Sequence, residues 1–264
     1  MNSVDTKFRT GSFPGRLCQG DYARDFTMDQ PKFSIGPYEL FSSIIAGAPL
    51  LLTGVLIYQP ISGARDFILT IKDASSIPVA VALILSAYIL GGLSSFVTWR
   101  YFLLLCRVFK MDFSYLGNMV LKNMAKIKPD LDKARIGSLE FEDRLAVLLL
   151  KKVGLIENLN HLDARVTSYL RLHAIQTTLV AESYLAQHIM YRGLSFGFLL
   201  LALALVANIF RTPSVTFEQI MLPFISLALS LAAFRRAVSF RRWRYREILL
   251  SFYHLAFGEQ QNPK

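Results

Sequence analysis

Residues 78–105, PVAVALILSAYILGGLSSFVTWRYFLLL, form the longest apolar run in this chain. A helix needs roughly twenty apolar residues to cross the hydrocarbon layer, which is about 30 Å thick, at about 1.5 Å per residue. Three further apolar runs of near that length lie at residues 40–58, 193–210 and 217–234. The sequence therefore predicts an all-α membrane protein with four transmembrane helices.

Charged side chains are scarce in these runs. Asp, Glu and Lys are missing from their interiors, with Glu218 in the first turn of the fourth run, and Arg100 lies near the end of the second. Transporters and proton relays usually place ionisable groups at membrane depth. This scarcity argues against a carrier that couples transport to ions or protons.

The excess of positive charge fits a membrane protein with a sizeable water-exposed part. Hydrophobic residues make up 53% of the 264 residues, and the formal net charge is +10. Anionic lipid headgroups attract each Lys or Arg beside a span by about 1 kcal/mol. No recognised nucleic-acid-binding motif accompanies the charge. The lipid bilayer, and not nucleic acid, is the partner that the charge indicates.

The distribution of Lys and Arg predicts the orientation. Only three of the 29 Lys and Arg residues, Arg65, Lys72 and Arg211, lie in the loops that close the two membrane hairpins. Short loops retained in the cytoplasm are enriched in Lys and Arg. We therefore expect a multi-pass protein of the inner (plasma) membrane with both termini and the middle segment in the cytoplasm.

The expected organisation is two transmembrane hairpins with a helical cytoplasmic segment between them. It has five parts, which are a polar cytoplasmic tail (1–37), a first transmembrane hairpin (38–108), a helical cytoplasmic domain (109–192), a second hairpin (193–234) and a basic amphipathic cytoplasmic tail (235–264).

Three helices are expected in or next to the middle segment. The first covers residues 115–126. The second has Ser138 as its N-terminal cap, acidic residues in its first turn and two lysines before Gly154, which are the usual start and stop signals of a helix. The third begins near Asn160 and has few breakers through Arg192, so we expect it to run unbroken into the third span.

Each hairpin is followed by aromatic and basic residues that suit headgroup depth. The tripeptide Trp-Arg-Tyr occurs near the end of the second span and again after the fourth. Trp and Tyr concentrate at membrane interfaces, and neighbouring cations attract anionic headgroups. The predicted membrane-interface anchors are Trp99, Arg100, Tyr101, Arg235, Arg236, Arg241, Arg242, Trp243, Arg244, Tyr245 and Arg246. Chance recurrence in an aromatic-rich chain is the alternative explanation of the repeated tripeptide.

Small residues recur every four positions in three of the spans. At this spacing they let helices approach closely in lipid, where dispersion and polar contacts supply the association energy. The predicted helix-packing residues are Ser43, Gly47, Ala87, Gly91, Ser95, Gly193 and Gly197. The contacts would join helices of one chain or of several copies.

No pattern indicates a catalytic, cofactor-binding or metal site. The four histidines lack the close spacing of convergent metal ligands. The acidic residues 140–143 suit a helix start, where the helix dipole favours negative charge. A membrane enzyme acting on lipid would need a polar cluster near the interface, for which the candidates are Arg100, Glu182, His188 and Arg192. We expect a protein that is not an enzyme and has no cofactor.

The flanks of the spans resemble a group of poorly characterised bacterial four-span membrane proteins. The resemblance is carried by Tyr38-Glu39-Leu40-Phe41-Ser42, Ala87-Tyr88-Ile89-Leu90-Gly91, Tyr191-Arg192-Gly193-Leu194-Ser195 and Phe234-Arg235-Arg236. Members of that group often have a Pro-Gly pair in the first span, where this chain has Gly47-Ala48-Pro49. The resemblance implies a bacterial inner-membrane protein, and some proteins of this build are membrane effectors of antiviral (anti-phage) defence.

Two functions are compatible with these patterns. The first is a membrane effector or sensor that forms homo-oligomers, whose cytoplasmic helices respond to a cytosolic protein partner or signal and whose spans alter the membrane. The second is a small channel or transporter subunit, with a pore between subunits lined by Ser, Thr and Asn208.

Overall fold

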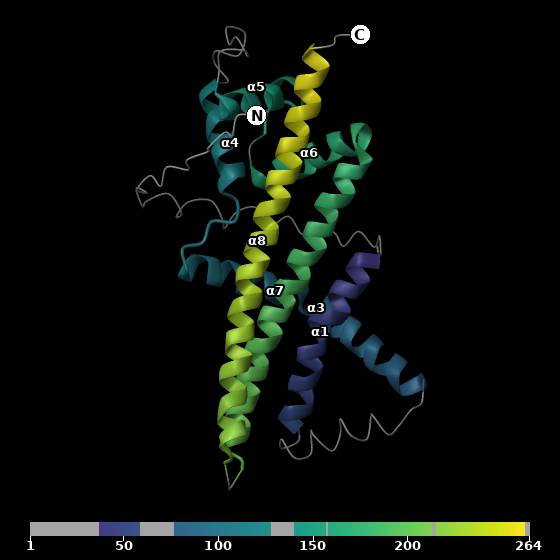
Figure 1. The fold of residues 1–264 in the computed structure, drawn as a ribbon, viewed down its shortest axis with the longest axis vertical. Helices are drawn as coiled ribbons and strands as arrows, with labels where there is room; N and C mark the ends of the chain where they lie inside the picture. The colour runs from purple at the N-terminus through teal and green to yellow at the C-terminus, as the bar shows by residue number, and fades with distance from the viewer. Residues whose placement is uncertain (1–36, 59–76, 128–139, 157, 213–214, 262–264) are drawn as a thin grey trace, which may run out of the picture. The chain divides into compact units, whose positions relative to one another are not determined.

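The computed structural model describes residues 37–58, 77–127, 140–156, 158–212 and 215–261, and every regular element in this part of the chain is an α-helix. Their order is α1 (Pro37–Tyr58), α3 (Ile77–Val108), α4 (Tyr115–Ile127), α5 (Phe141–Lys152), α6 (Leu159–His173), α7 (Ile175–Ile209) and α8 (Phe217–Gln261) (Figure 1). Four of them, α1, α3, α7 and α8, are long and apolar enough to cross a membrane. The predicted all-α, four-span membrane fold is confirmed.

Helices α7 and α8 form the most extensive helix pair of the fold and run side by side (Figure 1). Their antiparallel register is defined by two hydrogen bonds, from Ser226 Oγ to Phe198 O (2.8 Å) and from Ser230 Oγ to Ser195 O (2.7 Å). Residues 193–210 of α7 carry no charge. They span about 27 Å at about 1.5 Å per residue, which matches the hydrocarbon layer.

Helix α8 belongs both to the membrane bundle and to a helical domain formed with α4, α5 and α6. The fully buried side chains of this domain include Leu145, Leu148 and Leu149 of α5, Leu162, Val166 and Leu170 of α6, and Ile248, Leu249 and Phe252 of α8. The spacing of three or four residues places each set on one helix face. Burial of each side chain contributes about 1.5–3 kcal/mol, so the domain is held on α8 by its own apolar core.

The first two helices of the domain lie close to their predicted positions. Helix α4 occupies the expected 115–126 region and extends to Ile127. Helix α5 has Glu140 at its N-cap, whereas the expected cap, Ser138, lies outside the described residues. Gly154 follows the end of α5 with a φ of 85°, a left-handed conformation that glycine adopts without strain.

The prediction of one helix from Asn160 to Arg192 is wrong, because the chain leaves the helical conformation at Ala174, with φ −153° and ψ 74°. No glycine or proline marks this break. The cause is tertiary: the apolar face of α6 is buried in the domain core, so α6 and α7 follow different axes. From Ile175 onward the expected continuity into the third span is confirmed.

Candidate functional site: a buried junction where the domain meets the spans

Aromatic and cationic side chains of α3, of the connection between α3 and α4, and of α7 and α8 gather at the end of the charge-free part of α7. This cluster, the junction, comprises Trp99, Phe102, Phe113, His188, Arg192 and Phe234. The Phe102 ring centroid lies 4.9 Å from that of His188 and 5.7 Å from that of Phe234. The junction lies where α7 and α8 leave the bundle for the domain.

Arg192 is a cation buried between α7 and α3. Its residue is 7% exposed, and no ion pair joins it to another residue of the described part. Its Nη2 donates to Ser95 O (3.3 Å) and Ser95 Oγ (3.1 Å), and its guanidinium carbon lies 5.2 Å from the Trp99 ring centroid. A buried charge is costly unless such contacts compensate it. Arg192 therefore ties α7 to α3 at this level.

His188 lies one turn before Arg192 and is 1% exposed. Its Nδ1 lies 3.0 Å from Ala237 O on α8. Since a carbonyl oxygen only accepts hydrogen bonds, Nδ1 carries a hydrogen and donates. The other nitrogen, Nε2, has no partner among the described residues. His188 thus links α7 to α8 where Arg192 links α7 to α3.

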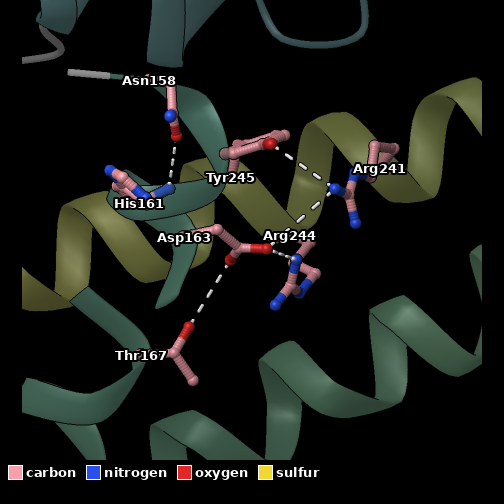
Figure 2. A network of polar contacts seen from close by, with 7 residues as sticks. All are labelled: Asn158, His161, Asp163, Thr167, Arg241, Arg244 and Tyr245. Atoms are coloured by element: carbon pink, nitrogen blue, oxygen red, sulfur yellow. Dashed lines mark hydrogen bonds and ion pairs between the residues drawn. The ribbon is translucent and has the colours of Figure 1, made fainter. Parts of the chain in front are cut away.

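A second polar group fixes α6 on α8 (Figure 2). This group, the clamp, comprises Asp163 of α6 with Arg241 and Arg244 of α8. Asp163 Oδ2 lies 2.5 Å from Arg244 Nη1 and 4.0 Å from Arg241 Nη2. Arg244 is 6% exposed. Removing one partner of a buried ion pair costs about 3–5 kcal/mol because the other charge is left uncompensated, so loss of either partner would destabilise this docking of the domain.

Local sequence places Asp163 for this contact. Asn158 caps α6, because its Oδ1 accepts a hydrogen bond from His161 N (2.8 Å, Figure 2). Asp163 then lies in the second turn, and Thr167 Oγ1 one turn later is 3.5 Å from its Oδ1. Leu162 beside it points into the domain core. Asp163 is thereby held at the edge of the core, facing α8.

Hydroxyl and amide groups join the spans to one another inside the bundle. Tyr101 Oη lies 3.4 Å from both Ser195 Oγ and Ser230 Oγ. Near the other end, Asn208 Nδ2 donates to Leu56 O (2.7 Å) and to a carbonyl of its own helix. Such contacts hold helices together in lipid. Asn208, proposed above as a pore-lining residue, instead bonds α7 to α1 of the same chain.

No protein-family model, curated protein or solved structure matches the chain. The structure supports a multi-pass membrane protein through its four candidate spans. The resemblance to bacterial four-span proteins stays a prediction.

The four residues named for a lipid-modifying enzyme do not form one cluster. His188 and Arg192 lie together in the junction, whereas Glu182 Oε1 pairs with Arg171 Nη2 (2.6 Å) on the surface of the domain side. Arg100 is exposed, over the Phe96 ring. Within the described ranges, no group of three or more His, Cys, Asp or Glu side chains is arranged to hold a metal ion.

The predicted interface anchors separate into two sets. The exposed ones are Arg100, Arg235, Arg236, Arg242, Trp243 and Arg246, and the partly or fully buried ones are Trp99, Tyr101, Arg241, Arg244 and Tyr245. Only the side chains of the first set are exposed and could contact lipid headgroups. The second set packs in the junction, the bundle or the clamp.

The small residues of the spans lie where helices of this chain approach most closely. A Cβ atom on Gly47 would lie 1.8 Å from Ala87 O, and one on Gly91 would lie 2.0 Å from Ser43 O. A Cβ atom on Gly193 would lie 2.4 Å from Ala46 Cβ. Gly197 likewise faces Pro49 on α1, and Ser95 accepts the hydrogen bonds of Arg192. These residues join α1 to α3, and α7 to α1 and α3.

Residue types alone did not indicate the role of Asp163. A signal was present on the partner helix: Arg244 lies four residues before Ile248 and seven after Ala237, so it falls on the buried stripe of α8. A cation within an apolar stripe indicates a buried partner, because an unpaired charge there would be costly. The sequence does not name that partner.

Proposed function

We propose that this protein is a non-enzymatic membrane effector or sensor, in which the helical domain responds to a partner or signal and the four spans alter the membrane. One observation carries the proposal: α7 and α8 each run without a break from the domain into the bundle. A helix is hydrogen-bonded along its length, so displacement of one end moves the other.

The clamp and the junction are the contacts that would transmit this movement. The clamp joins α6 to α8, and the junction joins α7 and α8 to α3. A ligand that favours a different docking of α6 on α8 would shift the population of bundle arrangements by its difference in affinity for the two states. Arg192 and His188 would transmit that shift to α3, because Arg192 bonds Ser95 and His188 packs on Phe102.

The orientation and the assembly are part of the same proposal. The distribution of Lys and Arg in the sequence supports an orientation with both termini and the domain in the cytoplasm. We propose that the spans act as a homo-oligomer. The resemblance to bacterial four-span proteins, some of them anti-phage effectors, supports the same class.

The hydrogen bonds of the polar residues in the spans weaken the channel alternative. Asn208, Ser226 and Ser230 make hydrogen bonds to carbonyl oxygens within the chain. A pore between copies would need other polar groups to line it. We therefore favour the effector over the channel.

The test uses the full chain in planar lipid bilayers, with Asp163→Asn to loosen the clamp. Glu182→Gln is the matched control, because it removes an exposed ion pair in the same part of the chain, and such pairs contribute little. We expect irregular leaks whose rate changes several-fold in Asp163→Asn and stays unchanged in Glu182→Gln. Unitary conductance steps would favour the channel, and an equal response of the two variants would overturn the coupling.

A further inference from the structure

Arg236 lies over two aromatic rings on α8, immediately beyond the apolar span. Its guanidinium carbon is 5.0 Å from the ring centroid of Phe240 and 5.2 Å from that of Trp243. Arg235 beside it is exposed, and no ion pair joins either arginine to another residue of the described part. Two adjacent cations at this position thus have no counter-charge in that part.

The rings under Arg236 are fixed by α7. Phe240 is buried and stacks on Tyr191, with centroids 5.4 Å apart and planes at 17°. Trp243 meets Phe240 edge to face at 5.1 Å and lies 6.1 Å from the Tyr184 ring. This group of four rings, the aromatic bracket, holds the guanidinium at one place. Pre-organisation of this kind lowers the entropy cost of binding a ligand.

The register of α7 and α8 gives the depth of this site. Ser195 faces Ser230, and His188 faces Ala237, so Arg235 and Arg236 lie level with the residues just before the charge-free part of α7. Arg236 is about 3 Å along the helix from Phe234. Each headgroup layer is about 5–8 Å thick. When the spans cross a bilayer, both arginines lie at the depth of the lipid phosphates.

We propose that Arg235, Arg236 and the aromatic bracket form a binding site for the headgroup phosphate of an anionic phospholipid. A guanidinium presents N–H donors in a planar fork that matches two phosphate oxygens, and it stacks on aromatic faces at the same time. The rings suit the glycerol level of the bilayer, where aromatic side chains concentrate. The site rests on the four spans crossing a membrane and is independent of the effector function.

The other arginines of α8 either contact other parts of the chain or lie too far from the span to belong to this site. Arg244 and Arg241 face Asp163, and Arg242 Nε donates to Asp112 O (2.9 Å). Arg246 is exposed like Arg236, but it lies about 15 Å further along the helix and therefore beyond the headgroup layer. General attraction to anionic lipid would involve every exposed arginine, whereas the proposed site depends on Arg235 and Arg236.

The test measures bound lipid by native mass spectrometry of the full chain, released from micelles containing phosphatidylglycerol or phosphatidylcholine. We expect phosphatidylglycerol to bind the unsubstituted protein in preference to phosphatidylcholine, and Arg236→Ala to weaken it by about tenfold, as expected for a lost charge-assisted pair. Arg246→Ala, which removes the same charge outside the site, should leave binding unchanged. Arg236 is exposed and contributes only its two ring contacts to stability, so both variants should keep a cooperative thermal unfolding transition close to that of the unsubstituted protein.

Arg236→Lys separates a built site from charge attraction, since it keeps the charge and loses the planar fork. We expect it to bind phosphatidylglycerol more weakly than the unsubstituted protein. Full binding by Arg236→Lys, or equal losses in Arg236→Ala and Arg246→Ala, would overturn the site. Displacement of the lipid by inorganic phosphate at the same concentration would assign the site to free phosphate and overturn the lipid assignment.

Discussion

The same tripeptide, Trp-Arg-Tyr, occurs near the end of the second span and after the fourth, yet its two copies bury different side chains. In the first copy, Arg100 is exposed and Trp99 packs in the junction. In the second, Arg244 is buried against Asp163 and Trp243 is 40% exposed. Identical local sequence therefore has different roles, because the face that each helix buries depends on what packs beside it.

The neighbours of the two copies explain this difference. Helix α3 ends at Val108, a few residues after its tripeptide, and its tripeptide faces α7 and α8 of the bundle. Helix α8 continues to Gln261, and α6 packs along this continuation. The first copy therefore stabilises the bundle, and the second docks the domain.

The largest expected difference between the copies concerns their arginines. Arg244→Ala leaves Asp163 with only the more distant Arg241, so it should destabilise the docked domain by about 3 kcal/mol. Arg100→Ala changes an exposed side chain and should alter the free energy of unfolding by no more than about 0.5 kcal/mol. Thermal unfolding of both variants in the same micelles measures the two effects. Equal losses of stability would remove the distinction between the copies.

A smaller effect is expected from the glycines that set the distance between α1 and α3. Gly91→Ala would place a Cβ atom 2.0 Å from Ser43 O, so the helices would have to separate. Overpacking of this kind costs about 1–3 kcal/mol. Gly92→Ala is the control, because nothing lies within 4 Å of its added Cβ. A Gly91→Ala protein as heat-stable as Gly92→Ala would show that α1 and α3 do not approach this closely in lipid.

The smallest expected difference concerns the two tryptophans. Trp99→Phe weakens the cation–π contact with buried Arg192 and should cost about 1 kcal/mol. Trp243→Phe changes a partly exposed ring and should cost about half as much. Chemical denaturation followed by circular dichroism measures both free energies. A larger loss in Trp243→Phe would reverse the assignment of Trp99 to the packed interior.

The spans and short helices of the fold followed from hydrophobic runs and helix signals. The helix break at Ala174 did not, because it contains no breaker and results from the burial of the α6 face on the domain core. The length of the fourth apolar run also did not indicate that α8 would belong to both the bundle and the domain. That sharing depends on the long-range match between the apolar stripes of α6 and α8.

The candidate site was only partly predictable for a similar reason. Residue types marked the basic and aromatic segment of α8 as interfacial, but they did not separate Arg236, which is exposed, from Arg244, which is buried. That separation requires the rotation of α8 against α6 and α7. The sequence offered Arg192 and His188 only as candidates for a polar cluster near the interface, because their contacts with Ser95 and Ala237 join distant parts of the chain.

The central claim, that the domain is coupled to the spans through the clamp and the junction, is tested most directly by hydrogen exchange of the full chain in lipid nanodiscs. Asp163→Ala is compared with the unsubstituted protein, and Glu182→Gln serves as the control. If the domain and the spans are coupled, Asp163→Ala should exchange faster in α6 and also at the backbone amides of α7 between His188 and Gly193, with no change in the control. Faster exchange confined to α6 would contradict this coupling.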